Sequence, residues 1–206
     1  MTAVVARPEE PDPIMSNPLC FDLPDWLDVH AAAYVATADV EARMAFVVDA
    51  ARRNVAEGTG GPFAAGVFEQ VSGRLMALGV NLVTTQGLSM LHAEVVALAL
   101  AQRRLATYDL GAAGLPPHEL VTSAEPCTMC LGAIGWSGVS HVVSGATDAD
   151  ARSVGFDEGP KPPDWAQALA ARGISVSEGV GRAAARAVLD QYRAQGGHIY
   201  NSREGR

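Results

Sequence analysis

The sequence predicts an α/β protein in which helices cover both faces of a sheet. After residue 90, short β-rich segments alternate with segments of strong helix formers, and this alternation favours mostly parallel strands. Before that point, two β-rich segments are separated by a Ser-Gly pair, which indicates an antiparallel hairpin. The chain has 206 residues, 49% of them apolar, so it is long enough to bury one core.

The N-terminal residues, 1–18, predict a flexible arm, because prolines and acidic residues interrupt any regular element there. We expect the remaining residues, 19–206, to form a single domain. Apolar side chains recur at helical spacing through residues 40–55, with Asp39 as the N-cap and Gly58 as the stop. The first regular element is therefore predicted to be an amphipathic helix.

The elements that follow are predicted from β-rich runs, helix formers and turn residues. The hairpin strands are residues 62–69 and 74–83, followed by a loop at 84–89. The later elements are a buried helix at 92–106, a strand at 119–124, a helix at 128–137, a strand at 141–146, a helix at 165–173, a strand at 174–180 and a final helix at 181–197. The final helix is expected to present Ala184, Ala187, Val188 and Tyr192 on its apolar side.

Charge and composition exclude several classes of function. The net charge is −8, which argues against nucleic acid as a partner, because phosphate backbones are bound by clustered Lys and Arg. No apolar run reaches the roughly 18 residues that a membrane-spanning helix needs. Three cysteines without a charged and then apolar leader suit a reducing compartment, so we expect a cytoplasmic protein with a small-molecule ligand.

Two short motifs supply groups that can carry chemistry. His92 and Glu94 open one predicted helix, and Cys127 and Cys130 open another directly after Pro126. One imidazole and two thiolates make three zinc ligands, which leave the fourth tetrahedral position for water, as in catalytic zinc sites. Glu94 lies close enough in sequence to exchange protons with that water.

Other interpretations of the cysteine pair are open from its spacing alone. Cys-x-x-Cys at a helix start is also typical of thiol redox proteins, although these do not need the upstream His-x-Glu. A structural zinc site, as in a non-catalytic binding module, needs a fourth ligand. The candidates His118, His141 and Cys20 show no paired spacing that would supply one.

These residues resemble the zinc-dependent cytidine deaminase superfamily, whose signature is H-x-E followed by P-C-x-x-C. More narrowly, residues 60–160 are similar to bacterial guanine deaminases of this superfamily, with GGPFAA, Asn81, HAE, SAEPCTMCLGAIGWSG and GFDEGP in their usual order. Transfer RNA adenosine deaminases share HAE and EPCxMCxGA but are generally basic and lack Trp136 and GFDEGP. The resemblance implies a three-layer α/β/α sandwich with a five-stranded mixed sheet. It also implies a homodimer whose C-terminal segment can close as a lid.

The resemblance assigns roles to individual residues. His92, Cys127 and Cys130 would bind one Zn²⁺ per chain, and Glu94 would be the catalytic proton shuttle. Glu158, preferred over its neighbour Asp157, would be a second catalytic carboxylate. The substrate-binding set comprises Phe63, Asn81, Ala93, Trp136, Phe156 and Asp157. Of these, the aromatic side chains would form the walls around a stacked base, and the Asn81 amide would hydrogen-bond to it.

Guanine is the expected substrate, hydrolysed to xanthine and ammonia. Its edge presents N1–H and an exocyclic amine, both donors, which suit an accepting carboxylate such as Glu158. The alternatives within the same chemistry are cytosine, a nucleoside, or an aminotriazine such as ammeline. One departure from the family pattern is Ala64, which stands where a glycine more usually follows GGPF.

Overall fold

The computed structural model describes residues 19–201, so the predicted arm at residues 1–18 lies outside the described part of the chain. The helices are α1 (Asp25–Ala32), α2 (Val40–Ala56), α3 (Val83–Gln86), α4 (Ala93–Leu105), α5 (Thr128–Ser137), α6 (Asp148–Val154), α7 (Trp165–Ala170) and α8 (Arg182–Ala194). The strands are β1 (Ala64–Glu69), β2 (Leu75–Val80), β3 (His118–Ala124), β4 (His141–Ala146) and β5 (Ser175–Ser177).

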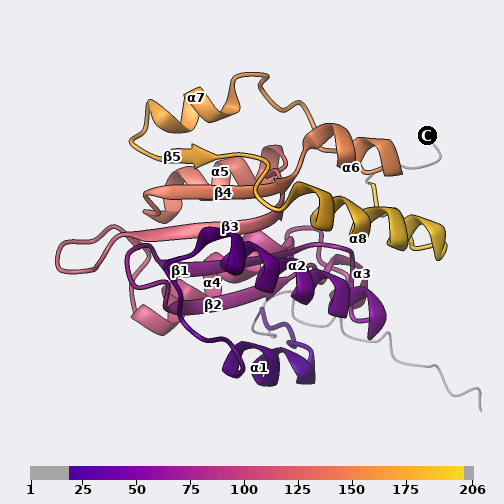
Figure 1. Cartoon of the computed structure of the whole chain (residues 1–206), viewed down its shortest axis with the longest axis horizontal. Coiled ribbons are helices and arrows are strands. Elements are labelled where there is room, and N and C mark those ends of the chain that lie inside the picture. The colour runs from indigo at the N-terminus through magenta and orange to yellow at the C-terminus, as the bar shows by residue number, and fades with distance from the viewer. Residues whose placement is uncertain (1–18, 202–206) are drawn as a thin grey trace, which may run out of the picture.

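The five strands form one mixed sheet in the order β2-β1-β3-β4-β5, which Figure 1 shows from bottom to top. Strand β1 pairs antiparallel with both β2 and β3, whereas β3, β4 and β5 run parallel. The predicted hairpin and the predicted parallel part of the sheet are both confirmed. Gly73 makes the hairpin turn with φ of +67°, and a Cβ there would lie 1.8 Å from the Thr37 carbonyl oxygen.

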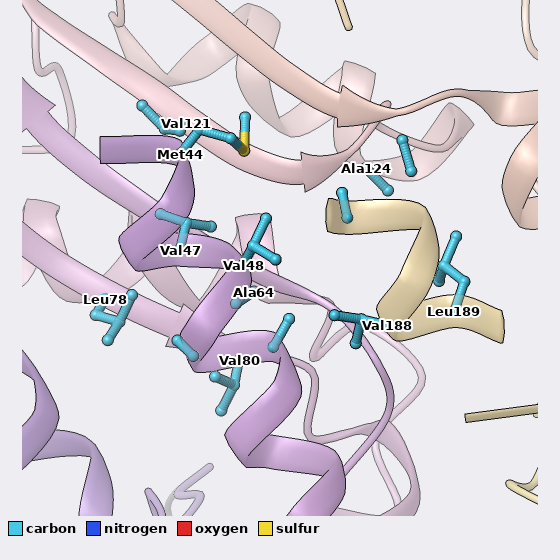
Figure 2. Close-up of a cluster of buried hydrophobic side chains, with 14 of the residues drawn as sticks. Met44, Val47, Val48, Ala64, Leu78, Val80, Val121, Ala124, Val188 and Leu189 are labelled. Carbon is cyan, nitrogen blue, oxygen red and sulfur yellow. The ribbon is translucent and has the colours of Figure 1, made fainter. Parts of the chain in front are cut away.

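Helices cover both faces of the sheet, which confirms the three-layer α/β/α architecture. On one face, α2 contacts β1 and β3 while α8 contacts β4. On the other face, α4 contacts β1 and β2 and also touches α5. Figure 2 shows Met44, Val47 and Val48 of α2 beside Val121 of the sheet and Val188 of α8. Each face therefore has its own buried apolar layer.

Several local features differ from the sequence-based expectations. The predicted loop after β2 contains the short helix α3, and α1 and α6 lie where no element is predicted. Helix α6 begins with a capping box, in which Thr147 and Asp150 each bond the other's backbone N–H. The expected apolar side of α8 is wrong at two positions, since Ala184 and Ala187 are exposed. The buried side is Ala185, Val188, Leu189 and Tyr192.

The strand predicted at 174–180 is reduced to three residues, because β5 is an edge strand paired only with β4. Within residues 19–201, none of the helices combines the length and the apolar character needed to cross a bilayer.

Candidate functional site

Two helix starts meet at the pocket and carry the three predicted metal ligands. His92 is the N-cap of α4, and Cys127 is the N-cap of α5, three residues after β3 ends. Cys130 follows one turn into α5 and is fully buried. Rigid helix ends hold these side chains, and the positive end of α5 favours the thiolate form of Cys127 at its N-cap.

The three side chains converge on a common point. His92 Nδ1 lies 3.5 Å from Cys127 Sγ and 3.6 Å from Cys130 Sγ, and all three ligand atoms lie within 4.8 Å of one another. Zinc bonds of about 2.3 Å to sulfur and about 2.1 Å to nitrogen, at a tetrahedral angle, place those atoms about 3.6 Å apart. The observed separations therefore fit one tetrahedral zinc ion.

Other possible ligands lie elsewhere. In the part of the chain that the structure describes, His92, Cys127 and Cys130 are the only group of His, Cys, Asp or Glu residues arranged to hold a metal. His118 Nδ1 faces the Leu110 carbonyl oxygen, and His141 contacts Glu119 and Ser177. The described residues thus offer a three-ligand group with an open fourth position, which is typical of catalytic rather than structural zinc.

The two thiols differ in acidity. Hydrogen bonding with Cys130, together with the bond to His92, lowers the pKa of the Cys127 thiol to about 4. The pKa of Cys130 is raised well above its ordinary value, first by its interaction with the Cys127 thiolate and then by burial. Metal binding therefore has to displace the proton that remains on Cys130.

Two buried carboxylates face the same pocket. Glu94 and Glu158 are 6% and 7% exposed, and neither forms an ion pair with any residue in 19–201. Burial raises the pKa of Glu94, and the charge of Cys127 raises it further. Burial likewise raises the pKa of Glu158 to about 8, with the charges of Cys127 and Glu94 adding to the effect. With this pKa, Glu158 can hold and release a proton near neutral pH.

The loop that carries Glu158 is anchored to the metal-binding helix. The backbone N–H and the hydroxyl of Thr128 both donate to the Glu158 carbonyl oxygen, each at 3.1 Å. Asp157 instead accepts the Gly159 N–H at 2.8 Å and keeps 58% of its side chain exposed. The two neighbouring acidic residues are therefore distinguished by burial, with only Glu158 directed into the interior.

A further carboxylate at the pocket is neutralised. Glu125 lines the cavity, but its Oε2 lies 2.6 Å from the Lys161 Nζ, and both side chains are at most 10% exposed. Lys161 also lies 4.8 Å from the centre of the Trp165 ring. Because it is paired with this buried cation, Glu125 is suited to support the site rather than to act on the substrate.

The pocket encloses about 460 Å³ and has aromatic and amide walls. Phe63 and Phe156 both line it, with ring centres 4.9 Å apart in an edge-to-face arrangement. Asn81 is 1% exposed, and its Oδ1 accepts the Val83 N–H at 3.2 Å. Because the amide oxygen of Asn81 is used in this bond, its Nδ2 is left as a donor toward the pocket. Among residues 19–201, Nδ2 has no hydrogen-bond acceptor.

Two of the residues assigned to substrate binding do not line this pocket. Trp136 is 82% exposed and lies on α5 with Arg172 stacked 5.5 Å from its ring centre. Trp136 does not line the pocket of its own chain, because the helix turns the indole to the surface, and its role as a wall around the base stays a prediction. Ala93 is fully buried between His92 and Glu94 and packs in the core behind them.

The C-terminal segment contributes residues that the sequence did not assign. Tyr200 and Asn201 line the pocket of their own chain. The Tyr200 hydroxyl is buried without a hydrogen-bond partner among the described residues, and burial raises its pKa well above the ordinary value. Asn201 accepts the Asp157 N–H at 2.8 Å and donates to the Gly155 carbonyl oxygen at 2.9 Å. The only sequence signal for these residues is the HIYN segment, which is too short to imply a role.

Comparisons with known proteins agree with this geometry. The family model for the cytidine and deoxycytidylate deaminase zinc-binding region matches residues 37–146. Guanine deaminase of Bacillus subtilis is 42% identical over 111 residues, which are 54% of this chain and 67% of that protein. The structure of NE0047 in complex with 2,6-diaminopurine superimposes with a TM-score of 0.83 and 50% identity, covering 88% of this chain and 96% of that one. A guanine deaminase from Nitrosomonas europaea gives a TM-score of 0.84 and 49% identity, over 87% and 98% of the two chains.

Proposed function

Because the chain belongs to the cytidine and deoxycytidylate deaminase zinc-binding family, we propose that it hydrolyses guanine to xanthine and ammonia. The single observation that carries the proposal is the arrangement of two buried, unpaired carboxylates beside the His92, Cys127 and Cys130 group. Relatives that are themselves guanine deaminases share 42% to 49% of their aligned residues with this chain. The proposal also includes one zinc ion per chain, held by those three residues.

When bound, zinc supplies a Lewis acid that lowers the pKa of water toward about 7. Glu94 then moves protons: it accepts one from the attacking water and delivers it to N3, the ring nitrogen beside C2. Its burial excludes bulk water, and its raised pKa allows it to carry the proton between these two atoms. Attack at C2 leaves the exocyclic amine as the group to be expelled.

Glu158 has a different part in the proposed reaction. As a carboxylate it can accept from the N1–H and amine edge of guanine, and as an acid it can protonate the departing nitrogen. A pKa of about 8 lets it occupy both forms near neutral pH. Asn81 would donate from Nδ2 to an acceptor of the purine, and Phe63 and Phe156 would enclose the ring.

The test of substrate is a comparison of ammonia release from guanine, cytosine, guanosine, cytidine and ammeline, using purified protein with a measured zinc content. Guanine is expected to give the largest kcat/KM. No ammonia from guanine, at a stoichiometry of one zinc per chain, would overturn the proposal. A higher kcat/KM for cytosine or ammeline would move the substrate to that compound within the same chemistry.

The zinc assignment is tested separately from turnover. We expect elemental analysis to find about one zinc per wild-type chain, as three ligands with an open position imply. Cys127→Ser should lose most of that metal, whereas Cys20→Ser, which changes an exposed thiol remote from the ligand group, should keep it. A metal-free wild type whose Cys127 and Cys130 cycle through a disulfide would instead support a thiol redox protein.

The exposed face of α5 supports the proposal of a homodimer. This helix has no charged residue, and Met129 and Trp136 on it are 39% and 82% exposed. Such a face beside an active site suits burial against a second copy. Light scattering should give the mass of a dimer, and Trp136→Glu should give that of a monomer. A monomeric wild type at micromolar concentration would contradict the proposal.

We also propose a cytoplasmic location, which rests on the free, metal-binding thiols Cys127 and Cys130. The lid is proposed to be the segment with Tyr200 and Asn201, which closes the pocket of its own chain.

A further inference from the structure

Asn54 is a fully buried polar residue outside the pocket, in the last turn of α2. Its Nδ2 donates to two carbonyl oxygens, that of Gly61 at 2.8 Å and that of Asn81 at 2.9 Å. Both hydrogens of one amide group are thus used on two segments far apart in sequence. The same two segments carry Phe63 and Asn81 into the pocket.

The orientation of the Asn54 amide is fixed from its other side. Its Oδ1 accepts the Thr59 hydroxyl at 2.7 Å, and the Thr59 oxygen in turn accepts the Trp26 Nε1–H at 3.1 Å. Only a nitrogen can donate to the two carbonyls and only an oxygen can accept the hydroxyl, so the amide has one consistent orientation. A chain of hydrogen bonds therefore runs from α1 to the wall of the pocket.

Backbone pairing joins these two segments only as far as Phe63 and Asn81. The β1–β2 ladder ends at Ala64 and Val80, and its last extension is the bond from the Asn81 N–H to the Phe63 carbonyl oxygen at 3.0 Å. Beyond that bond, the Gly61 and Asn81 carbonyls are both acceptors and cannot pair with each other. The Asn54 amide supplies the two donors that join them.

The approach of the two segments is close. A Cβ at Gly60 would lie 1.8 Å from the Asn81 carbonyl oxygen and 2.8 Å from Asn54 Nδ2. There is no room for the loop to shift inward, and loss of the bridge would let it move outward. An outward movement of the loop would shift Phe63 relative to Asn81, because the Phe63 N–H is bonded to the Gly61 carbonyl oxygen at 2.9 Å.

We propose that Asn54 is a positioning residue for base binding: together with the backbone bond from Asn81 to Phe63, it fixes how these two residues face the base by bridging the Gly61 and Asn81 carbonyls. Through Thr59 and Trp26, the same bridge makes α1 part of the support of the pocket. The inference rests on the proposed function, because it takes Asn81 as a contact of the base. A small displacement of a binding group by a remote change can alter affinity or rate by one to two orders of magnitude.

The test uses a binding measurement beside the kinetic one. Asn54→Asp keeps the size of the side chain but removes both donors. We expect it to weaken binding of 8-azaguanine, measured by calorimetry, about tenfold, and to raise KM for guanine by a similar factor with kcat changed far less. Leu169→Ala is the control: it destabilises the core on the opposite face and should leave both values unchanged.

A second pair of variants covers the case in which Asn54→Asp does not fold. Thr59→Val removes the hydroxyl that orients the amide and should weaken binding about threefold, while Thr59→Ser should restore most of the affinity. Unchanged affinity in folded Asn54→Asp, or equal affinity in Thr59→Val and Thr59→Ser, would overturn the inference. Wild-type protein that binds 8-azaguanine without deaminating guanine would overturn the proposed function alone. Absence of both binding and turnover would overturn both.

Discussion

Buried carboxylates lie at the amino end of β3 and beyond its carboxyl end, and the two groups have opposite electrostatic surroundings. At the amino end, Glu119 is 1% exposed, with Arg43 Nε at 2.7 Å and His141 Nδ1 at 3.0 Å. The Arg43 contact is an ion pair rather than a hydrogen bond, because the N–H does not point at the oxygen. Beyond the carboxyl end, Glu94 and Glu158 are almost as buried but have no cation paired with them among residues 19–201.

The comparison shows that pairing with a cation, rather than burial alone, distinguishes a structural carboxylate from one that is suited to take part in a reaction. A buried carboxylate with a paired cation joins elements, as Glu119 joins α2 to β3 and β4. A buried carboxylate without one has a raised pKa, as Glu94 and Glu158 do, which suits it to the proton transfers proposed for them. Glu125, beside the pocket but paired with Lys161, belongs with Glu119.

The largest expected effect is that of Glu94→Gln. We expect kcat for guanine to fall about 10³-fold or more, because the amide cannot carry a proton between water and the ring nitrogen. Zinc content, measured on the same preparation, should stay at the wild-type value, since Glu94 is not one of the three converging ligands. A variant with zinc and near-normal kcat would remove Glu94 from the reaction.

Glu158→Gln should have the next largest effect, a fall in kcat/KM of about 10- to 100-fold. The matched control is Asp157→Asn, one residue away, which removes the same charge from an exposed side chain. We expect that variant to stay within about twofold of wild type. Equal loss in both variants would show that the loop needs its acidic charge generally, without a specific role for Glu158.

Glu119→Gln should give the reverse result, a change in stability without a comparable change in turnover. Arg43 has a side chain only 5% exposed and would lose its buried counter-charge. Removing one partner of such a pair costs about 3 kcal/mol of unfolding free energy. Urea titration measures this loss, and steady-state assays of the folded variant should give nearly wild-type kcat. A collapse of kcat with unchanged stability would break the proposed distinction.

The smallest expected effect concerns Asp150 and depends on pH. Hydrogen bonding from Arg182, with further bonds from Thr147, lowers the pKa of this carboxyl below its usual range. A depressed pKa stabilises the fold above the unfolded value of about 3.9, and the contribution is lost as the pH falls. Asp150→Asn should therefore cost about 1–2 kcal/mol at pH 7, discounted because Arg182 is half exposed.

Unfolding curves at several pH values check this expectation. The difference between Asp150→Asn and wild type should shrink as the pH falls below about 4. A difference that stays constant from pH 7 to pH 3 would show that the charge of Asp150 is not the cause. Turnover of guanine at pH 7 should be unchanged, as Asp150 does not line the pocket.

The fold and the metal group could be predicted from the sequence because their signals are local. Alternating β-rich and helix-forming segments, with a Ser-Gly turn, predicted all five strands. His92, Cys127 and Cys130 have side chains whose chemistry is specific, and their places at predicted helix starts indicated that they could meet. The capping box of Thr147 and Asp150 was an available signal for α6 that the prediction did not use.

The rest depended on contacts between residues distant in sequence. Composition and motif give Trp136 the same weight as Phe156, but only packing turns one to the surface and the other to the pocket. Tyr200 reaches the pocket because the chain folds back after α8, and no spacing predicts that return. Asn54 is an unremarkable polar residue near a helix end until the segments of Gly61 and Asn81 are seen to meet at its amide.

The most direct test of the account is product analysis of wild-type protein acting on guanine. Purified protein with about one zinc per chain should convert guanine to xanthine and ammonia in equal amounts. The rate should be proportional to the enzyme concentration. That result would confirm that zinc-loaded protein deaminates guanine. Zinc-loaded, folded protein that leaves guanine unchanged would contradict the account.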